Sequence, residues 1–390
     1  MKPDHYPEEF DSIRPYSEEE LSLALQRITQ CPDFETASRF VYPDSDPDDV
    51  RRQILSINSV DEFQKTIMYV AIKRIIDTTI DNLTWDGCDA LDPNTPYLFV
   101  SNHRDIVLDA FLLQYVNYLN DIPTCQITFG ANLMKHPLVV ELGRLNKMFR
   151  VERGGSLRSF YSSMAQVSSY IRYCITQRRE SVWIAQRNGR TKDGIDLTEP
   201  SLLKMFATSG NQDKDQITNL AELNIVPVAI SYFWEPCDWM KAREMSITAA
   251  GGVYHKSEDE DLRSILTGIM QPKGNVHISV RKPITPDDLR SADRIRSSSG
   301  ALDVGTQTLK HSSTQAFKSL AHLIDQRIHD GYRLTANNYI AHDIRSGTNK
   351  YADKYTAEQR ETFLAHTLKH SNTQTLKHLI DIYANPIQGE

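Results

Sequence analysis

The stretch that decides the fold is YLFVSNHRDIVLD, residues 97–109. A short apolar run ends abruptly in polar residues, which is the pattern of a buried strand that leaves a sheet and turns toward a helix. Loops at such strand ends carry a large share of binding and catalytic side chains. The stretch therefore predicts an α/β fold with a candidate site around His103.

Four further segments are candidate strands, at residues 126–129, 182–185, 225–230 and 276–280. Helical patterns such as 156–177 lie between them. This alternation predicts a central mixed sheet flanked by helices. Pro227 interrupts the run 225–230, and a proline inside a strand indicates an edge strand or a bulge.

Both flanks of this region read as helical extensions. Ser17 and Glu20 form a capping-box pattern, and a second helix is predicted to begin at Ser59. The second helix has an apolar stripe flanked by cations, so it either lies in a membrane interface or packs on the next domain. We predict a helical region over 1–84, an α/β domain over 85–286 and a helical region over 287–390.

The composition limits the function classes. A net charge of -7 provides no reason to expect nucleic acid as a partner. The five cysteines form no Cys-x-x-Cys pair, and no histidine spacing matches a familiar ligand pattern, so we expect no metal site and a reducing cytoplasm. No apolar run approaches the roughly 20 residues that span a bilayer, so membrane lipid would be reached from the surface.

His103 is the first candidate for chemistry. Imidazole has an unperturbed pKa near about 6.5, which suits a general base at neutral pH. It needs an acceptor that fixes its tautomer, and Asp105 or Asp109 could serve. Neither spacing places histidine and aspartate on one face of a straight helix. The pair can therefore meet only if His103 lies in the turn before the helix.

A second candidate is the basic segment with Lys147, Arg150 and Arg153. Alternate residues of an extended chain point to one face, so Lys147 and Arg153 could share a face while Arg150 points away. A solvated surface strand is the alternative. If the residues do act together, they form an anion-binding cluster.

A third candidate is the turn that follows the apolar run 182–185. It contains Arg187, Asn188, Gly189 and Arg190. Glycine lets the backbone approach a ligand closely, and backbone N–H groups together with arginine can hold a phosphate. A plain charged turn is the alternative.

Taken together, these segments resemble the four blocks of the glycerolipid acyltransferases, the family of lysophosphatidate and glycerol-3-phosphate acyltransferases, over roughly residues 85–285. The segment from His103 to Asp109 resembles the His-x4-Asp block, and Phe149 to Arg153 the block that ends in an acidic residue and arginine. The turn from Arg187 to Arg190 resembles the Pro-Glu-Gly-Thr-Arg block, and residues 226–228 the proline-containing block. The sequence around these four blocks is similar to a divergent bacterial branch of the family.

Two departures from the family pattern stand out. His103 and Asp109 are separated by five residues where the family usually has four, so either the turn contains a bulge or Asp105 orients the histidine. We favour Asp109, because Leu108-Asp109 resembles the end of the family block. Asn188 stands where the family has glutamate, and asparagine keeps hydrogen-bonding capacity without the charge.

The resemblance implies acyl transfer from acyl-CoA or acyl-carrier protein to a hydroxyl of a glycerol-phosphate-type acceptor such as lysophosphatidate. In that scheme His103 acts as general base and Asp109 orients it. The residues implied in phosphate binding are Lys147, Arg150, Arg153, Arg187, Asn188, Gly189 and Arg190. No bound cofactor is implied, and we expect a peripheral protein on the inner face of the cell membrane. The alternatives are a non-catalytic lipid-binding or acyl-chain-binding protein of the same fold, and a thioesterase.

Overall fold

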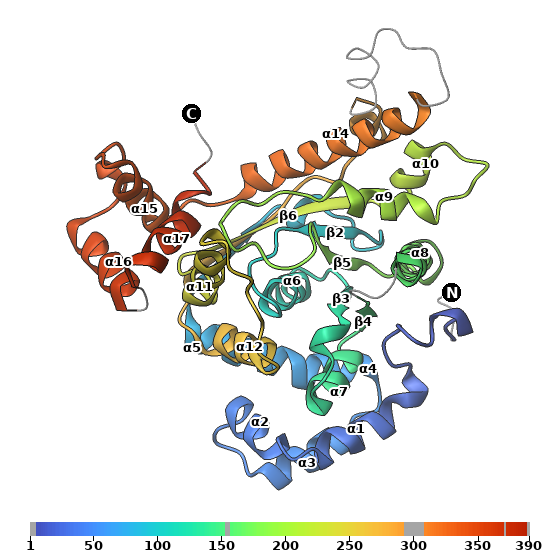
Figure 1. Cartoon of the computed structure of the whole chain (residues 1–390). Helices are drawn as coiled ribbons and strands as arrows, with labels where there is room; N and C mark the ends of the chain where they lie inside the picture. The colour runs from blue at the N-terminus through green and yellow to red at the C-terminus, as the bar shows by residue number, and fades with distance from the viewer. Residues whose placement is uncertain (1–4, 153–156, 292–307, 370–371, 388–390) are drawn as a thin grey trace.

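The computed structural model describes residues 5–152, 157–291, 308–369 and 372–387. A seven-stranded sheet with the order β1-β7-β6-β2-β5-β3-β4 forms its centre (Figure 1). Helices flank this sheet and extend the chain at both ends, which confirms the predicted fold class. The strands are β1 (Ile80–Asp86), β2 (Leu98–Ser101), β3 (Gln126–Gly130), β4 (Met148–Val151), β5 (Val182–Ala185), β6 (Ile225–Tyr232) and β7 (Gly274–Val280).

The strand directions bring three loops together. Strands β2 to β6 run parallel to one another, whereas β7 is antiparallel to β6 and pairs in parallel with β1. Ser101, the last residue of β2, pairs with Ala185 on β5 and with Val228 on β6. The loop after β2 therefore lies between the loop after β5 and the end of β6, at the carboxyl edge where ligands bind in open α/β sheets.

Strands β2 and β5 and residues 225–230 of β6 are continuous or nearly continuous apolar runs, because both faces of the sheet are buried there. Phe99, Trp183 and Val228 belong to the core beneath α5, α6 and α12, while Leu98, Val100 and Ile184 belong to the opposite core, beneath α8, α9 and α14. These helices are α5 (Tyr69–Thr79), α6 (Leu108–Leu119), α8 (Leu157–Tyr173), α9 (Pro200–Thr208), α12 (Glu260–Met270) and α14 (Thr308–Gly331).

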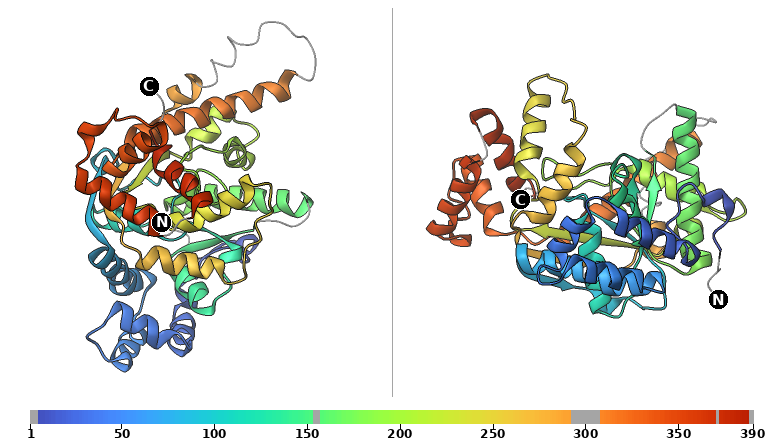
Figure 2. Two further views of the ribbon diagram at one scale, coloured as in Figure 1. Left: turned by 60° about the vertical axis from the view of Figure 1, so that its left-hand side comes forward. Right: turned by 90° about the horizontal axis from the view of Figure 1, so that it is seen from below.

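Two helical groups lie beside the sheet, and Figures 1 and 2 show them on different sides of the molecule. The N-terminal group packs on α7 (Pro137–Leu145) and consists of α1 (Leu21–Gln30), α2 (Phe34–Val41), α3 (Pro47–Leu55) and α4 (Val60–Phe63). The C-terminal group packs on α11 (Asp238–Ala249) and consists of α15 (Ala336–Ser346), α16 (Ala357–Lys369) and α17 (Thr373–Ala384). The short helix α10 (Gln216–Ala221) adjoins α9.

The N-terminal helices begin where the caps predict. Ser17 and Glu20 form the capping box, and the Ser59 hydroxyl accepts the Glu62 N–H at the start of α4. A π-helical turn, Gln64–Met68, joins α4 to α5. Phe63, Ile67 and Ile75 of the apolar stripe are buried in protein, which favours packing on the next domain over a membrane interface. In the described ranges no helix is both long and apolar enough to cross a bilayer.

Pro227 corrects one prediction, because β6 is a central strand and not an edge. The Pro227 carbonyl accepts the Arg281 N–H, one residue beyond the last β6–β7 pair. The N–H and C=O groups of one strand residue point to the same side. An N–H at Pro227 would therefore point beyond the last β6–β7 residue pair, so its absence removes no hydrogen bond between the paired residues. The domain division stays a prediction, although the sheet already begins at Ile80 in β1.

Candidate active site

His103 lies in the turn between β2 and α6, and its side chain is bonded to Asp109. Its Nδ1 is 3.0 Å from the Asp109 Oδ2, and the residue is 7 % exposed. Asp109 stands in the first turn of α6, so the preceding turn folds back far enough for the two side chains to meet. The Trp183 ring contacts the imidazole edge-on at 5.9 Å between centroids. The structure thus joins His103 to Asp109.

Asp105 has a different task from Asp109. Its Oδ1 accepts the backbone N–H groups of Val107 and Leu108, so it caps the start of α6. Its Oδ2 is buried, and the structure gives it no hydrogen bond among the described residues. Burial, with the nearby charge of Asp109, raises the pKa of this carboxyl. Asp105 therefore builds the turn, and the imidazole is bonded to Asp109 instead.

Arg104 anchors the same turn from below. Its guanidinium is buried and binds the Asp196 carboxylate at 2.7 Å and the Glu235 carboxylate at 3.1 Å. Lys241 completes the cluster, because its Nζ lies 2.5 Å from Glu235 and donates to the Arg104 carbonyl. Sequence reasoning missed this cluster, since no local pattern links residues so far apart along the chain.

The loop after β5 is tied to the β2–α6 turn by several hydrogen bonds. The Thr191 N–H donates to the His103 carbonyl at 2.7 Å, and the Thr191 hydroxyl donates to Asp196. Asn102 donates to the same Asp196 and exchanges two bonds with the Ile230 backbone on β6. The loops after β2 and β5 therefore form one rigid unit with the end of β6.

The basic turn predicted from sequence follows β5 directly. Gly189 has a φ of +77°, with no atom within 4 Å of the position that a Cβ would occupy, so the turn is open to a ligand. The Arg187 Nε and the Arg190 Nη1 are buried, and neither has a hydrogen-bond partner among the described residues. Arg190 also interacts electrostatically with the side chains of Asp105 and Cys237. This turn has donors available for an anion.

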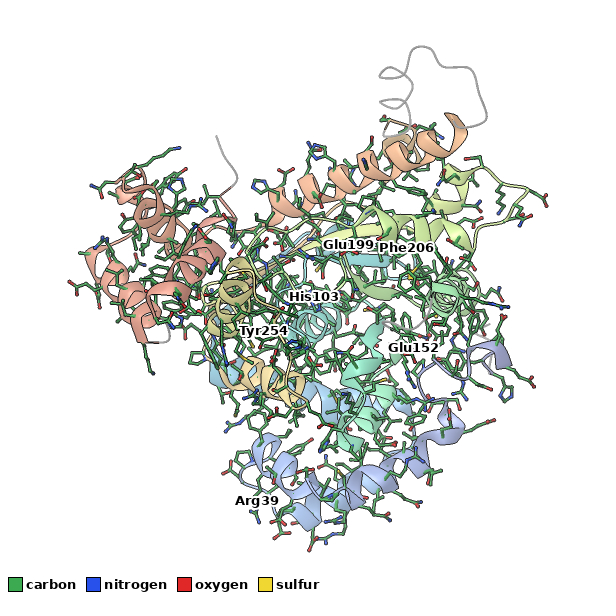
Figure 3. The ribbon with its side chains drawn as sticks, in the orientation of Figure 1. Arg39, His103, Glu152, Glu199, Phe206 and Tyr254 are labelled. Carbon is green, nitrogen blue, oxygen red and sulfur yellow. The ribbon has the colours of Figure 1, made fainter. Side chains whose placement is uncertain are left out.

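A groove of about 390 Å³ opens beside this turn, at the carboxyl ends of β3, β4 and β5. Figure 3 shows His103 near the middle of the molecule, with Glu152 and Glu199 toward the α8 and α9 side. Most of the lining is apolar, from Phe129, Val151, Phe160, Met164, Val167, Ile184, Ala185, Leu202 and Met205. The polar lining includes Arg187, Asn188, Glu152 and Glu199.

The structure does not bring all predicted basic residues to His103. Lys147 precedes β4, at the opposite end of the sheet, and its Nζ donates to Thr124. Arg150 is half exposed and reaches the groove only through its 2.6 Å ion pair with Glu152. Arg153 lies outside the described residues. Among the described residues, no group of histidine, cysteine and carboxylate side chains could hold a metal ion.

These features define the class: an α/β protein with a histidine–aspartate pair at the carboxyl edge of its sheet. Residues 82–231 match the model of the Acyltransferase family. The chain therefore contains an acyltransferase domain, and the resemblance seen in the sequence is confirmed for this segment. The matched segment contains His103, Asp109 and the basic turn.

Comparison with curated protein sequences finds no match. Among solved structures, one similar chain is the 1-acyl-sn-glycerophosphate (LPA) acyltransferase PlsC from Thermotoga maritima. The identity is 11%, the TM-score is 0.35, and the alignment covers 79% of this chain and 95% of that one.

Proposed function

We propose that this protein transfers a fatty acyl group from an acyl thioester, acyl-CoA or acyl-carrier protein, to a hydroxyl of a glycerol-phosphate-type acceptor such as lysophosphatidate. The observation that supports this most is the buried His103–Asp109 pair inside a segment that matches the acyltransferase family. With Nδ1 bonded to Asp109, the Nε2 of His103 has no hydrogen-bond partner among the described residues and can act as a base.

The reaction needs one proton to move from the acceptor hydroxyl to His103 and then from His103 to the leaving thiolate. The His103 Nε2 takes the proton of the acceptor hydroxyl while the hydroxyl oxygen attacks the thioester carbon. Asp109 stabilises the imidazolium that results. When the carbon–sulfur bond breaks, the thiolate takes the proton from the imidazolium, and the ester and the free thiol leave. General base assistance of this kind contributes roughly 10²–10⁴-fold to the rate.

The acceptor phosphate is assigned to the turn after β5. Arg187 and Arg190 each have a buried nitrogen without a hydrogen bond among the described residues, and a phosphate would supply the acceptors. The open backbone at Gly189 can approach the ligand and is a candidate donor to the oxyanion at the thioester carbon. The adjoining apolar groove suits an acyl chain.

A panel of donors and acceptors tests this function. Acyl-CoA and acyl-carrier protein are offered with lysophosphatidate, glycerol 3-phosphate or no acceptor, and free thiol and ester are both measured. We expect thiol release that depends on the acceptor and equals ester formation. Thiol release without an acceptor would identify a thioesterase, and vesicle or acyl-chain binding with no turnover on any pair would identify a non-catalytic binding protein.

The phosphate assignment has its own test. Arg187→Ala and Arg190→Ala should raise the acceptor KM at least about tenfold and change the donor KM less than about twofold, because a charge-assisted bond contributes roughly 1.5–3 kcal/mol. Arg158, an exposed residue near the start of α8, provides the matched control as Arg158→Ala. Equal rises in both KM values would remove the assignment.

A further inference from the structure

The Asp109 carboxylate is completely buried and accepts four hydrogen bonds. Its Oδ2 accepts from the Arg104 N–H at 2.7 Å and the Asp105 N–H at 3.0 Å, and it lies 3.0 Å from the His103 Nδ1. Its Oδ1 accepts from the Tyr232 hydroxyl at 2.8 Å. Three donors thus converge on one oxygen, and all three come from the β2–α6 turn. The other oxygen depends on a single side chain from a different element.

Tyr232 is the last residue of β6, and it is 2 % exposed. Burial and the nearby negative charges of Asp109 and Asp105 hold the pKa of this phenol well above its usual value. The hydroxyl therefore keeps its proton at every pH at which an imidazole base works, and it is always the donor in this bond. The position of Tyr232 is set by the central strand, which Asn102 ties to the β2–α6 turn.

We propose that Tyr232 is a positioning residue that acts through Asp109, holding the carboxylate so that Oδ2 faces the His103 Nδ1. This inference rests on the proposed function for its kinetic consequence, but its structural consequence can be measured without turnover. A carboxylate anchored at both oxygens cannot rotate away from the imidazole. With Oδ1 unanchored and buried, the negative charge of Asp109 would lack one of its four donors.

The orientation of the Asp109 carboxylate also determines which nitrogen of His103 holds the proton. When Asp109 accepts from Nδ1–H, the neutral imidazole presents Nε2 as the free base. If the carboxylate turns away, the Nδ1–H tautomer loses the bond that favours it. Tyr232 thus supports the tautomer that the reaction requires, without touching the substrate.

Tyr232→Phe removes only the hydroxyl and keeps the ring in the core. We expect kcat to fall about 10- to 100-fold while both KM values stay within about twofold. Tyr170→Phe is the matched control, because Tyr170 is equally buried and donates to the Gln126 side chain away from His103. Its kcat should stay within about twofold. In an Asp109→Asn background, Tyr232→Phe should add less than about threefold, since the two residues act as one unit.

The second readout is the tautomer of His103, followed by ¹⁵N NMR in selectively labelled protein. Tyr232→Phe should raise the fraction of Nε2–H tautomer, and Tyr170→Phe should leave it unchanged. If Tyr232→Phe does not fold, Tyr232→3-fluorotyrosine keeps the shape and changes only the acidity of the hydroxyl. It should shift the Nδ1–H resonance of His103.

The outcomes separate the two claims. If the wild-type protein shows no transfer on any donor–acceptor pair but Tyr232→Phe still changes the His103 tautomer, the positioning role stands and the proposed function is overturned. Active wild-type protein with an unchanged kcat and an unchanged His103 spectrum in Tyr232→Phe would overturn the positioning role alone. A kcat loss that is fully retained in the Asp109→Asn background would also overturn it, because Tyr232 would then not act through Asp109.

Discussion

At the scale of single residues, two aspartates near His103 have separate tasks that one pair of substitutions can distinguish. Asp109→Asn removes the anionic partner of the imidazole and should lower kcat roughly 10²–10⁴-fold. Asp105→Asn keeps an oxygen for the N–H groups at the start of α6, so kcat should stay within about threefold. Steady-state kinetics on both variants is the measurement. Similar losses in the two would contradict the division of tasks.

Asp105 also predicts a pH effect on stability. Burial raises its pKa in the folded protein above the ordinary value of 3.8, so the folded state binds this proton more tightly than the unfolded state does. The free energy of unfolding should therefore contain a component that is present at low pH and falls as the pH rises through the raised pKa. Denaturant titrations across this range should show the component in the wild type but not in Asp105→Asn.

Residue patterns predicted part of the candidate site. His103 and Asp109 stand close in the sequence, and the end of an apolar run marks the loop that contains them. Tyr232 and the Arg104 partners Asp196 and Glu235 were missed. Each joins the site only because β6 and the loop after β5 lie beside β2 in the sheet. The order of the strands in the sheet places these side chains beside the β2–α6 turn, and a local sequence motif does not predict that order.

At the scale of elements, α12 covers the β2–α6 turn closely at one glycine. A Cβ at Gly268 would lie within 2.2 Å of the buried Asp105 Oδ2. Gly268→Ala should therefore destabilise the protein by about 1–3 kcal/mol despite the better helix propensity of alanine. Gly143→Ala on α7 is the control, because its Cβ would meet only the flexible Met148 side chain. Thermal unfolding that ranks the two variants the other way would show that α12 can move aside.

The strands that sequence analysis found share one property. Strands β2, β3, β5, β6 and β7 are buried on nearly every residue because they are covered on both faces. The edge strand β1 was missed, since only its first residue, Ile80, is buried and the others are half-buried or exposed. Strand β4 is short, Met148–Val151, and the sequence analysis considered its segment for the basic residues and not for an apolar pattern. An edge strand has one partner and needs less apolar surface, so its signal is weak.

At the scale of the whole molecule, the C-terminal helices support the loop that holds Arg104. Gly194 lies in this loop with a φ of +81°, and a Cβ there would lie within 2.2 Å of the Ile382 carbonyl on α17. The Gly194 carbonyl in turn accepts from Arg104. Asn385 donates to the neighbouring Asp193 carbonyl. A change at this contact should reach the β2–α6 turn through one buried side chain, that of Arg104.

Gly194→Ala should combine the strain of a positive φ with a backbone clash and cost more than about 2 kcal/mol in the free energy of unfolding. Gly251→Ala is matched in φ at +81° but has no atom within 4 Å of the added Cβ, so only the strain of about 1–2 kcal/mol applies. Limited proteolysis should release the C-terminal helices earlier in Gly194→Ala. Equal stability and equal cleavage in both variants would show that α17 does not depend on this contact.

The measurement that tests the central claim most directly is acyl transfer by His103→Ala. His136→Ala is the control, because His136 forms a 3.0 Å pair with Asp33 among the N-terminal helices. With the donor and acceptor that the wild-type protein uses, His103→Ala should lose about 10³-fold or more in kcat and keep the thermal stability of the wild type. His136→Ala should keep its rate. A His103→Ala protein with folded structure and a kcat within threefold of the wild type would contradict the assignment of His103 as the base.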